Sequence, residues 1–227
     1  MNVIIIIPVF NEEENIKDVA RASLKYGDVL VVDDGSSDDT KKRAVESGAK
    51  VISHVNNEGK GAAIKTGINE ALKYPYDAYI FLDGDGQHDP NLIPSLIEKL
   101  NYVNVVIGSR FLKKELKNMP FQRRLSNLIT TGLISFISGI SITDSQSGFR
   151  GVTREIAEIF LSSPYDDYRF ESDVLIRVSS NKIIKYDEVS IPVIYNNESS
   201  YVTHKHALEY VLFISKNIIK NIFKRIS

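Results

Sequence analysis

Short runs of apolar residues alternate with amphipathic segments through the first half of this 227-residue chain. Each run is rich in Val and Ile, and polar residues do not alternate with the apolar ones inside it. Such continuous runs are typical of strands that are buried on both faces of a parallel sheet. The pattern predicts strands over Val3–Val9, Asp28–Asp33, Lys50–Val55, Ala78–Leu82 and Asn104–Gly108.

The segments between these runs are predicted to be helices, since they carry helix caps and stops. We expect them from Asn11 to about Tyr26, from Asp38 or Asp39 to Ser47, from the 56–61 loop to about Tyr74, and from Pro90 to Leu100. Strands that alternate with helices predict an α/β fold with a mostly parallel, doubly wound sheet flanked by helices. Ligands bind such sheets at the carboxyl ends of the strands.

The second half of the chain is less regular. Its apolar spacing predicts helices over Phe121–Ile137, around Arg154–Leu161 and around Glu171–Ser179. Ile183–Tyr195 is expected to be a long strand or a strand pair, interrupted at Pro192. A last amphipathic helix is expected over roughly His206–Ile226.

Composition narrows the function classes. The chain has no cysteine, which excludes disulfides, thiolate metal sites and a cysteine nucleophile. Its net charge of -1 disfavours a dedicated nucleic-acid binder, so no nucleic-acid partner is expected. The charge is unevenly distributed, however. Residues 1–109 carry 11 basic and 17 acidic side chains, whereas residues 110–227 carry 17 basic and 12 acidic ones. An acidic half suits a cation, and a basic half suits anions or an anionic membrane surface.

The sharpest chemical feature is the Asp83-Gly84-Asp85 turn, which follows a predicted strand. Two carboxylates, with the amide of Gln87 close by, form a hard, oxygen-rich donor set. Such groups suit Mg²⁺ or Mn²⁺ that bridges phosphates. Asp83 and Asp85 are therefore the candidate catalytic residues, and these carboxylates, together with Gln87 and His88, are the candidate metal-binding groups.

Two further polar loops follow predicted strands. A carboxylate after the second strand, where Asp33 and Asp34 lie, commonly accepts hydrogen bonds from a ribose or a base. Lys60 lies at the start of a predicted helix, where it would meet a base or a phosphate. The spacing around Lys60 is not that of a P-loop, and no Gly-x-Gly-x-x-Gly follows the first strand. A dinucleotide-dependent dehydrogenase is therefore disfavoured.

Taken in order, these segments resemble family 2 glycosyltransferases of the GT-A fold, most closely the polyprenyl-phosphate sugar synthases. The matching segments are IPVFNEEENI, VVDDGSSDDT, NEGKGAAIKTGI, FLDGDGQHDP, VIGSRF and TDSQSGFRG, and the resemblance spans roughly residues 3–195. It implies a nucleotide-sugar donor and Mg²⁺ or Mn²⁺ as cofactor. It places the nucleotide against Pro8, Asn11, Glu12, Asp33 and Asp34. It also implies that Asp85 and Gln87 are the ligands of the divalent cation, with Asp83 near the ribose and the metal. Gly84 departs from the alanine that family members often carry between the two aspartates.

The same resemblance implies an acceptor site in the second half of the chain. It assigns Arg110 and Arg124 to the phosphate of an acceptor lipid, and guanidinium groups suit a phosphate monoester because they bind it in a bidentate way. Glu171 lies where the family carries an acidic pair that faces the donor sugar. A phosphate monoester is largely a dianion at pH 7, so the acceptor needs no separate base.

The apolar face of the 121–137 helix either joins the core or lies along an isoprenoid chain. The predicted C-terminal helix carries Lys216, Lys220 and Lys224 beside its apolar face. A basic amphipathic helix indicates a membrane surface or a partner protein. The alternative is that this helix packs on its own domain. We therefore divide the chain into a catalytic domain, 1–200, and an amphipathic C-terminal helix, 201–227. No stretch resembles a spanning segment or a signal peptide.

The leading hypothesis is an inverting transfer of a hexose from a nucleotide sugar to dolichyl or polyprenyl phosphate. GDP-mannose and UDP-hexoses remain open as donors. The protein is expected to be cytoplasmic and peripheral at the cytoplasmic face of the membrane, with or without a membrane partner subunit. Two alternatives are a transferase of the same fold with a soluble or glycan acceptor, and a non-catalytic nucleotide-sugar-binding subunit.

Overall fold

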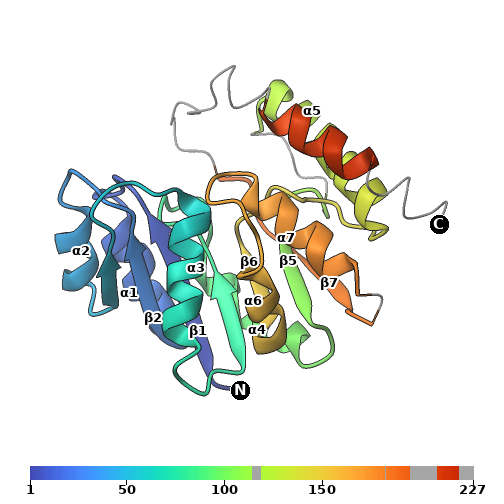
Figure 1. Cartoon of the computed structure of the whole chain (residues 1–227). Helices are drawn as coiled ribbons and strands as arrows, with labels where there is room; N and C mark the ends of the chain where they lie inside the picture. Colours follow the sequence, from blue (N-terminus) through green and yellow to red (C-terminus); the bar gives the residue numbers. More distant parts are fainter. Residues whose placement is uncertain (114–118, 182, 195–208, 220–227) are drawn as a thin grey trace.

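The computed structural model describes residues 1–113, 119–181, 183–194 and 209–219 of the chain. Its centre is a seven-stranded sheet with the order β3-β2-β1-β4-β6-β5-β7. Helices cover both faces of this sheet (Figure 1). The mostly parallel α/β architecture predicted from the sequence is confirmed.

The strands occupy nearly the predicted positions in the first half of the chain. They are β1 (Val3–Val9), β2 (Asp28–Asp33), β3 (Lys50–Ser53), β4 (Ala78–Phe81) and β5 (Val105–Ser109). β1 pairs in parallel with both β2 and β4, and β2 pairs in parallel with β3. Their carboxyl ends therefore share one edge, as expected for a doubly wound sheet.

Two strands come from the second half of the chain. β6 (Arg150–Thr153) lies antiparallel between β4 and β5, and β7 (Tyr186–Ser190) pairs in parallel with β5. The sequence patterns did not predict β6. The strand predicted over Ile183–Tyr195 is shorter than expected and ends before Pro192, which cannot donate a ladder hydrogen bond.

Two helical layers bury the sheet between them. One layer holds α3 (Lys60–Ala71), α6 (Arg154–Phe160) and α7 (Phe170–Ser179), and the other holds α1 (Ile16–Ser23), α2 (Thr40–Glu46), a 3₁₀ turn η1 (Pro90–Leu92) and α4 (Ile93–Leu100). Alternate side chains of β1 enter the two cores, since Ile4 and Ile6 join one cluster and Ile5 and Ile7 the other. This double burial explains why the strand is apolar throughout.

The first helix begins later than predicted. Asn11 was expected to cap it, but α1 begins at Ile16 with Asn15 in the N-cap position. Asn11 instead has a left-handed φ of 55°, and its side-chain oxygen accepts a hydrogen bond from the Ser37 amide at 2.9 Å. Tertiary contact has therefore replaced the local cap, since Asn tolerates this conformation better than most residues.

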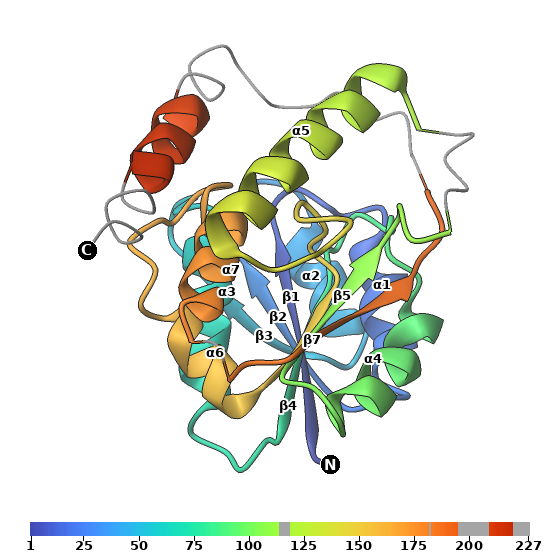
Figure 2. The same ribbon diagram turned by 90° about the vertical axis from the view of Figure 1, so that its right-hand side faces the viewer.

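The long helix α5 (Phe121–Ser138) lies across the carboxyl ends of the strands (Figure 2). It ends at Gly139, whose left-handed conformation is typical of a helix C-terminus. Residues 209–219 form a further helix beside it, coloured red in Figure 1. The rest of the C-terminal helix predicted over His206–Ile226 lies outside the described residues.

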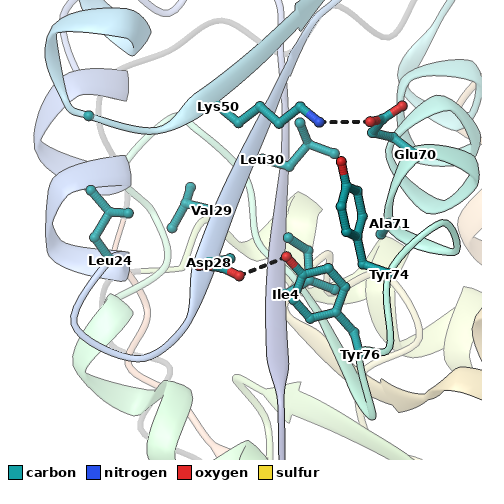
Figure 3. A pocket seen from close by; sticks show the side chains of 11 residues that line it. Ile4, Leu24, Asp28, Val29, Leu30, Lys50, Glu70, Ala71, Tyr74 and Tyr76 are labelled. Carbon is teal, nitrogen blue, oxygen red and sulfur yellow. Dashed lines mark hydrogen bonds and ion pairs between the residues drawn. The ribbon is translucent and has the colours of Figure 1, made fainter.

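A cavity of about 310 Å³ lies at the amino ends of β1 and β2, opposite the edge described below (Figure 3). Its polar side chains are paired with one another. Lys50 Nζ lies 2.7 Å from Glu70 Oε1, and the Tyr76 hydroxyl donates a 2.7 Å hydrogen bond to Asp28 Oδ2. These pairs tie β2 and β3 to α3 and to the segment that follows it.

Candidate active site

The polar loops that the sequence predicts to be neighbours do meet at one edge of the sheet. The loops after β1 and β2 are joined by hydrogen bonds between their residues. The Asn11 amide donates to Ser36 Oγ at 2.9 Å, and the Glu12 amide donates to Thr40 Oγ1 at 2.7 Å. Pro8 is buried in β1, opposite Val32 of β2. Asn11 and Glu12, two of the predicted nucleotide-binding residues, are thus positioned by the segment after β2.

Asp33 and Asp34 are both buried, and they hold different partners. Asp33 accepts a hydrogen bond from the Ser36 amide within its own turn. Asp34 Oδ1 lies 2.7 Å from His54 Nδ1, and Asp34 Oδ2 accepts the Gly59 amide at 2.8 Å. Asp34 therefore shapes the 54–59 loop after β3. His54 could not be predicted as the partner of Asp34, because no local sequence pattern links two residues on neighbouring loops.

Lys60 lies between two carboxylates. Its ammonium is 2.7 Å from Asp83 Oδ1 and 2.7 Å from Glu171 Oε1. Burial disfavours the charged ammonium, but the charges of Asp83 and Glu171 outweigh burial and raise the pKa of Lys60. Burial likewise opposes ionisation of Asp83, but the charge of Lys60 prevails and lowers the pKa of Asp83 to about 2. We call these three residues the Asp83–Lys60–Glu171 cluster.

The amino end of α3 is already capped by protein groups. The Asp166 carbonyl accepts hydrogen bonds from the amides of Gly61 and Ala62 at 2.7 and 3.2 Å. A Cβ on Gly59, which has a φ of 102°, would lie 2.4 Å from the same carbonyl. Lys60 therefore faces the site through its side chain, whereas these helix amides bind the 166–170 segment.

The QSGFR segment packs against the cluster, although it is distant in sequence. A Cβ on Gly148 would lie 2.7 Å from Asp83 Oδ2 and 3.0 Å from Lys60 Nζ. Only glycine allows this approach without displacing the charged groups. The segment thus packs directly against the charged groups of the site.

Arg150 fastens this segment to α7. It is buried, and its guanidinium donates to three backbone carbonyls, those of Ser145, Ser147 and Glu171, at 2.8, 2.8 and 2.9 Å. Burial lowers the pKa of Arg150, against the nearby negative charge of Glu171. Arg150 therefore fixes the backbone of Glu171 relative to the QSGFR segment.

The residues predicted to hold a metal lie directly after β4. Asp85 Oδ1 accepts the Gln87 amide at 2.9 Å, and the Asp83 amide donates to His88 Nδ1 at 3.2 Å. Burial and the charge of Asp83 raise the pKa of Asp85. Two carboxylates whose negative charges oppose each other are a favourable environment for a divalent cation, and carboxylate and amide oxygens are the donors that Mg²⁺ and Mn²⁺ prefer.

This donor set fits a cation that is completed by other ligands. Within the described ranges, no group of three or more His, Asp and Glu side chains is arranged to hold a metal ion alone. Packing fixes the orientation of the His88 ring, which stacks on the Phe149 ring with centroids 5.4 Å apart. A cation at Asp85 would therefore need oxygens from a ligand or from water, as is usual for Mg²⁺ bound together with phosphates.

Arg110 is held at the end of β5 by a buried carboxylate. Its Nε and Nη2 donate to Asp144 Oδ2 and Oδ1 at 2.7 and 3.0 Å, in a bidentate pair. Asp144 is fully buried, and it also accepts a 2.8 Å hydrogen bond from the side-chain amide of Asn127 on α5. One carboxylate thus connects Arg110 with the long helix.

Arg124 lies in the first turn of α5, where it is exposed. The chain between β5 and α5 includes residues 114–118, which are outside the described part. The structure thus places Arg110 and Arg124 on consecutive elements of the same side of the molecule, with Arg110 anchored and Arg124 at the surface.

The chain is similar in sequence to known proteins. Glycosyl transferase family 2 matches residues 4–160, which are more than half of the chain. The UDP-N-acetylglucosamine–dolichyl-phosphate N-acetylglucosaminyltransferase of Methanococcus voltae is 34% identical over 219 residues, covering 86% of this chain and 86% of that protein. The dolichol-phosphate mannosyltransferase of Pyrococcus furiosus is 33% identical over 199 residues, and this alignment covers 82% of this chain and 55% of that protein.

A solved structure shows the same fold. Glucosyl-3-phosphoglycerate synthase from Mycobacterium tuberculosis, in a complex with Mn²⁺, uridine diphosphate and phosphoglyceric acid, superposes with a TM-score of 0.69 at 21% identity. The alignment covers 99% of this chain and 78% of that one. The fold and the site therefore define a glycosyltransferase of the GT-A class. The chain belongs to glycosyl transferase family 2.

Proposed function

We propose that this protein transfers a hexose from a nucleotide sugar to dolichyl or polyprenyl phosphate, with inversion at the sugar C1. The observation that carries the proposal is the position of Arg110. Asp144 holds its guanidinium at the end of β5, on the sheet edge that also bears the Asp83–Lys60–Glu171 cluster. An anion site beside a donor site suits an acceptor phosphate. The Methanococcus voltae relative, which matches 86% of this chain, carries a lipid phosphate in its name.

In the reaction, an oxygen of the acceptor phosphate attacks the sugar C1. A new C1–O bond forms as the bond from C1 to the nucleoside diphosphate breaks, and the diphosphate leaves. The acceptor is a dianion at neutral pH and needs no proton removed. Asp33, Pro8, Asn11 and Glu12 line the nucleotide side, and Arg110 and Arg124 bind and orient the acceptor.

A divalent cation, Mg²⁺ or Mn²⁺, would be held by Asp85 and Gln87, and when bound it neutralises charge on the leaving diphosphate. Asp83 is held by Lys60 beside it, within reach of a ribose. Lys60 lies between Asp83 and Glu171 and keeps Asp83 ionised. Arg150 fixes the backbone of Glu171, which we assign to the sugar side. We place the reaction at the cytoplasmic face of a membrane.

The test is transfer of label from a panel of nucleotide sugars. The purified protein is incubated with GDP-mannose, UDP-glucose or UDP-N-acetylglucosamine, polyprenyl phosphate and Mn²⁺, and the lipid is extracted. We expect one donor to label the lipid and a chelator to abolish the labelling. Label that appears only on a soluble or glycan acceptor would instead support the alternative transferase.

Variants separate the two halves of the proposal. Asp85→Asn is expected to lose most metal-dependent turnover, whereas Asp39→Asn, at an exposed carboxylate paired with Lys42 on the surface, is the matched control. Arg110→Ala is expected to lose transfer while donor binding survives. Full turnover by Asp85→Asn would overturn the metal assignment. No turnover by the wild-type protein with any donor, despite nucleotide binding, would favour a non-catalytic binding subunit.

A further inference from the structure

The side chain of Asp34, which the family resemblance assigns to the nucleotide, binds its own chain instead. Oδ1 lies 2.7 Å from His54 Nδ1 and accepts the Glu58 amide at 2.9 Å, and Oδ2 accepts the Gly59 amide at 2.8 Å. A carboxylate offers about four acceptor positions, so the protein fills roughly three of them. The residue is also only 3% exposed. Asp34 is therefore buried and largely occupied by groups of the protein itself.

His54 connects Asp34 to the helix α3. The other ring nitrogen of His54, Nε2, lies 2.9 Å from Thr66 Oγ1, and the His54 side chain is only 9% exposed. Because a carboxylate can only accept hydrogen bonds, Nδ1 carries the proton that Asp34 receives, and the Thr66 hydroxyl can donate to a neutral Nε2. Both ring nitrogens thus have a partner. We call these three side chains the Thr66–His54–Asp34 bridge.

The bridge holds both ends of the loop that connects β3 to α3. At the first end, the His54 amide donates to the Asp33 carbonyl at 2.8 Å, while its ring binds Asp34. At the other end, the Gly59 amide binds the second oxygen of Asp34. Residues 55–58, which lie between these points, are exposed, so burial of their side chains contributes little to the shape of the loop. The hydrogen bonds to Asp34 therefore set that shape.

This loop borders the predicted nucleotide side and leads directly into Lys60. A Cβ on Gly35 would lie 2.6 Å from the carbonyl carbon of Asn56, so the loop packs against the turn that follows Asp33. Lys60 is the first residue of α3, and its ammonium is 2.7 Å from Asp83 Oδ1. A change in the shape of the loop would therefore move both the surface beside Asp33 and the backbone that carries Lys60.

We propose that His54 is a positioning residue for the donor nucleotide, and that it acts by holding Asp34 so that the β3–α3 loop keeps one shape. In this role, Asp34 orients the loop and does not itself bind the base. The inference rests on the proposed function for the identity of the ligand, a nucleoside diphosphate. A loop that already has its bound shape favours binding, because less conformational entropy is lost when the ligand arrives.

The test compares substitutions of His54 that keep or remove the hydrogen bond to Asp34. His54→Phe keeps a ring but has no donor, whereas His54→Asn places an amide nitrogen near the position of Nδ1. Calorimetric titration of the full chain with UDP and with GDP, in the presence of Mn²⁺, measures nucleotide binding. We expect His54→Phe to weaken binding of the preferred nucleotide by about tenfold or more, and His54→Asn to restore it to within about threefold of the wild type.

Two further measurements separate positioning from a general loss of structure. Hydrogen exchange of the Glu58 and Gly59 amides should be faster in His54→Phe than in the wild type, and slow again in His54→Asn. KM for the donor should rise in His54→Phe while KM for the acceptor stays unchanged. Tyr76→Phe is the matched control, because it removes a hydrogen bond to a carboxylate, Asp28, at the opposite end of β2 (Figure 3). It should change neither nucleotide binding nor the exchange of these two amides.

If His54→Phe does not fold, Thr66→Val takes its place, since it removes only the hydroxyl bound to Nε2 and should weaken nucleotide binding about threefold. Binding by the folded variant equal to that of the wild type overturns the proposal, as does an equal loss in His54→Phe and His54→Asn. Nucleotide binding that depends on His54, with no transfer to any lipid phosphate, supports the bridge and overturns the proposed function. A wild-type protein that binds neither UDP nor GDP overturns both.

Discussion

At the residue scale, the glycine between the two aspartates is required by packing. A Cβ on Gly84 would lie 2.3 Å from Val9 Cγ1, within the core that α1 and β1 share. Gly84 replaces the alanine that is common in the family. In this chain, it packs against Val9 of β1.

Gly84→Ala is therefore expected to destabilise the protein by about 1–3 kcal/mol, because the extra methyl overpacks a buried contact. Thermal or urea unfolding in the absence of metal measures this change. Gly132→Ala is the control, since its Cβ would meet nothing within 4 Å and the residue lies inside α5. It should be neutral or stabilise by about 0.5–1 kcal/mol. Equal effects of the two substitutions would refute the packing argument.

A second residue-scale prediction concerns Lys60. Lys60→Met keeps the length of the side chain but leaves Asp83 and Glu171 without their shared cation. We expect a loss of about 2 kcal/mol, less than for a fully buried ion pair, because a third of the Lys60 side chain (33%) is exposed and solvent screens the charges.

Urea unfolding measures this loss, and calorimetry with a nucleoside diphosphate should show weakened binding as well. Lys42→Met removes one partner of an exposed pair with Asp39 and is expected to change stability by less than about 1 kcal/mol. A Lys60→Met protein as stable as Lys42→Met would show that the three charged groups do not interact appreciably.

At the element scale, the first half of the fold could be predicted because its strands are long and apolar on both faces. β6 could not. Arg150-Gly151-Val152-Thr153 has neither a period nor an apolar run, and it is a strand because it pairs with β4 on one side and β5 on the other. A Cβ on Gly151 would approach Ile80 and Leu100 at 3.0 and 3.1 Å, so this residue suits a crowded central strand.

The candidate site also has parts that the sequence predicts and parts that it does not. The positions of Asp33, Asp83, Asp85 and Arg110 could be predicted, because Asp33 ends a strand and the other three follow one, and these strands reach the same edge. The contacts of Lys60 with Glu171 and of Gly148 with Asp83 join distant segments, and no local pattern specifies them. The family resemblance pointed to these segments, but the structure supplies the distances.

The same scale gives a prediction for Asp144, which connects β5 to α5. Asp144→Asn leaves the partly buried Arg110 guanidinium beside a neutral amide, and it removes one of the oxygens that can accept from Asn127. We expect a loss of about 3 kcal/mol in stability, in the range for breaking a buried pair. If Arg110 binds the acceptor, KM for the acceptor should also rise more than KM for the donor.

Steady-state kinetics with each substrate varied in turn measure the change in KM for the acceptor and for the donor. Glu188→Gln is a useful comparison. Glu188 is a partly buried carboxylate that accepts hydrogen bonds from Thr143, the residue before Asp144, and not from Arg110. It should lower stability without a selective effect on the acceptor. A selective donor effect in Asp144→Asn would contradict the role given to Arg110.

At the scale of the whole molecule, no helix among the residues described here is long and apolar enough to cross a bilayer. The structure instead gives the 209–219 helix two different faces. Phe213 and Ile214 are buried in the larger core cluster, and the Phe213 ring meets Tyr165 edge-on with centroids 5.1 Å apart. The boundary between residues 1–200 and 201–227 stays a prediction, but these contacts give it a thermodynamic test.

If the 209–219 helix is part of the cooperative unit, Phe213→Ala should lower the free energy of unfolding by about 3–5 kcal/mol, the usual cost of removing a buried aromatic side chain. Val211→Ala, at a position 58% exposed, should change it by less than about 0.5 kcal/mol. Both are measured by urea unfolding monitored at two probes. A small effect of Phe213→Ala, with a second transition, would mean that the helix docks and undocks independently. In that case, the groove between α5 and the 209–219 helix would lose one wall whenever the helix opened.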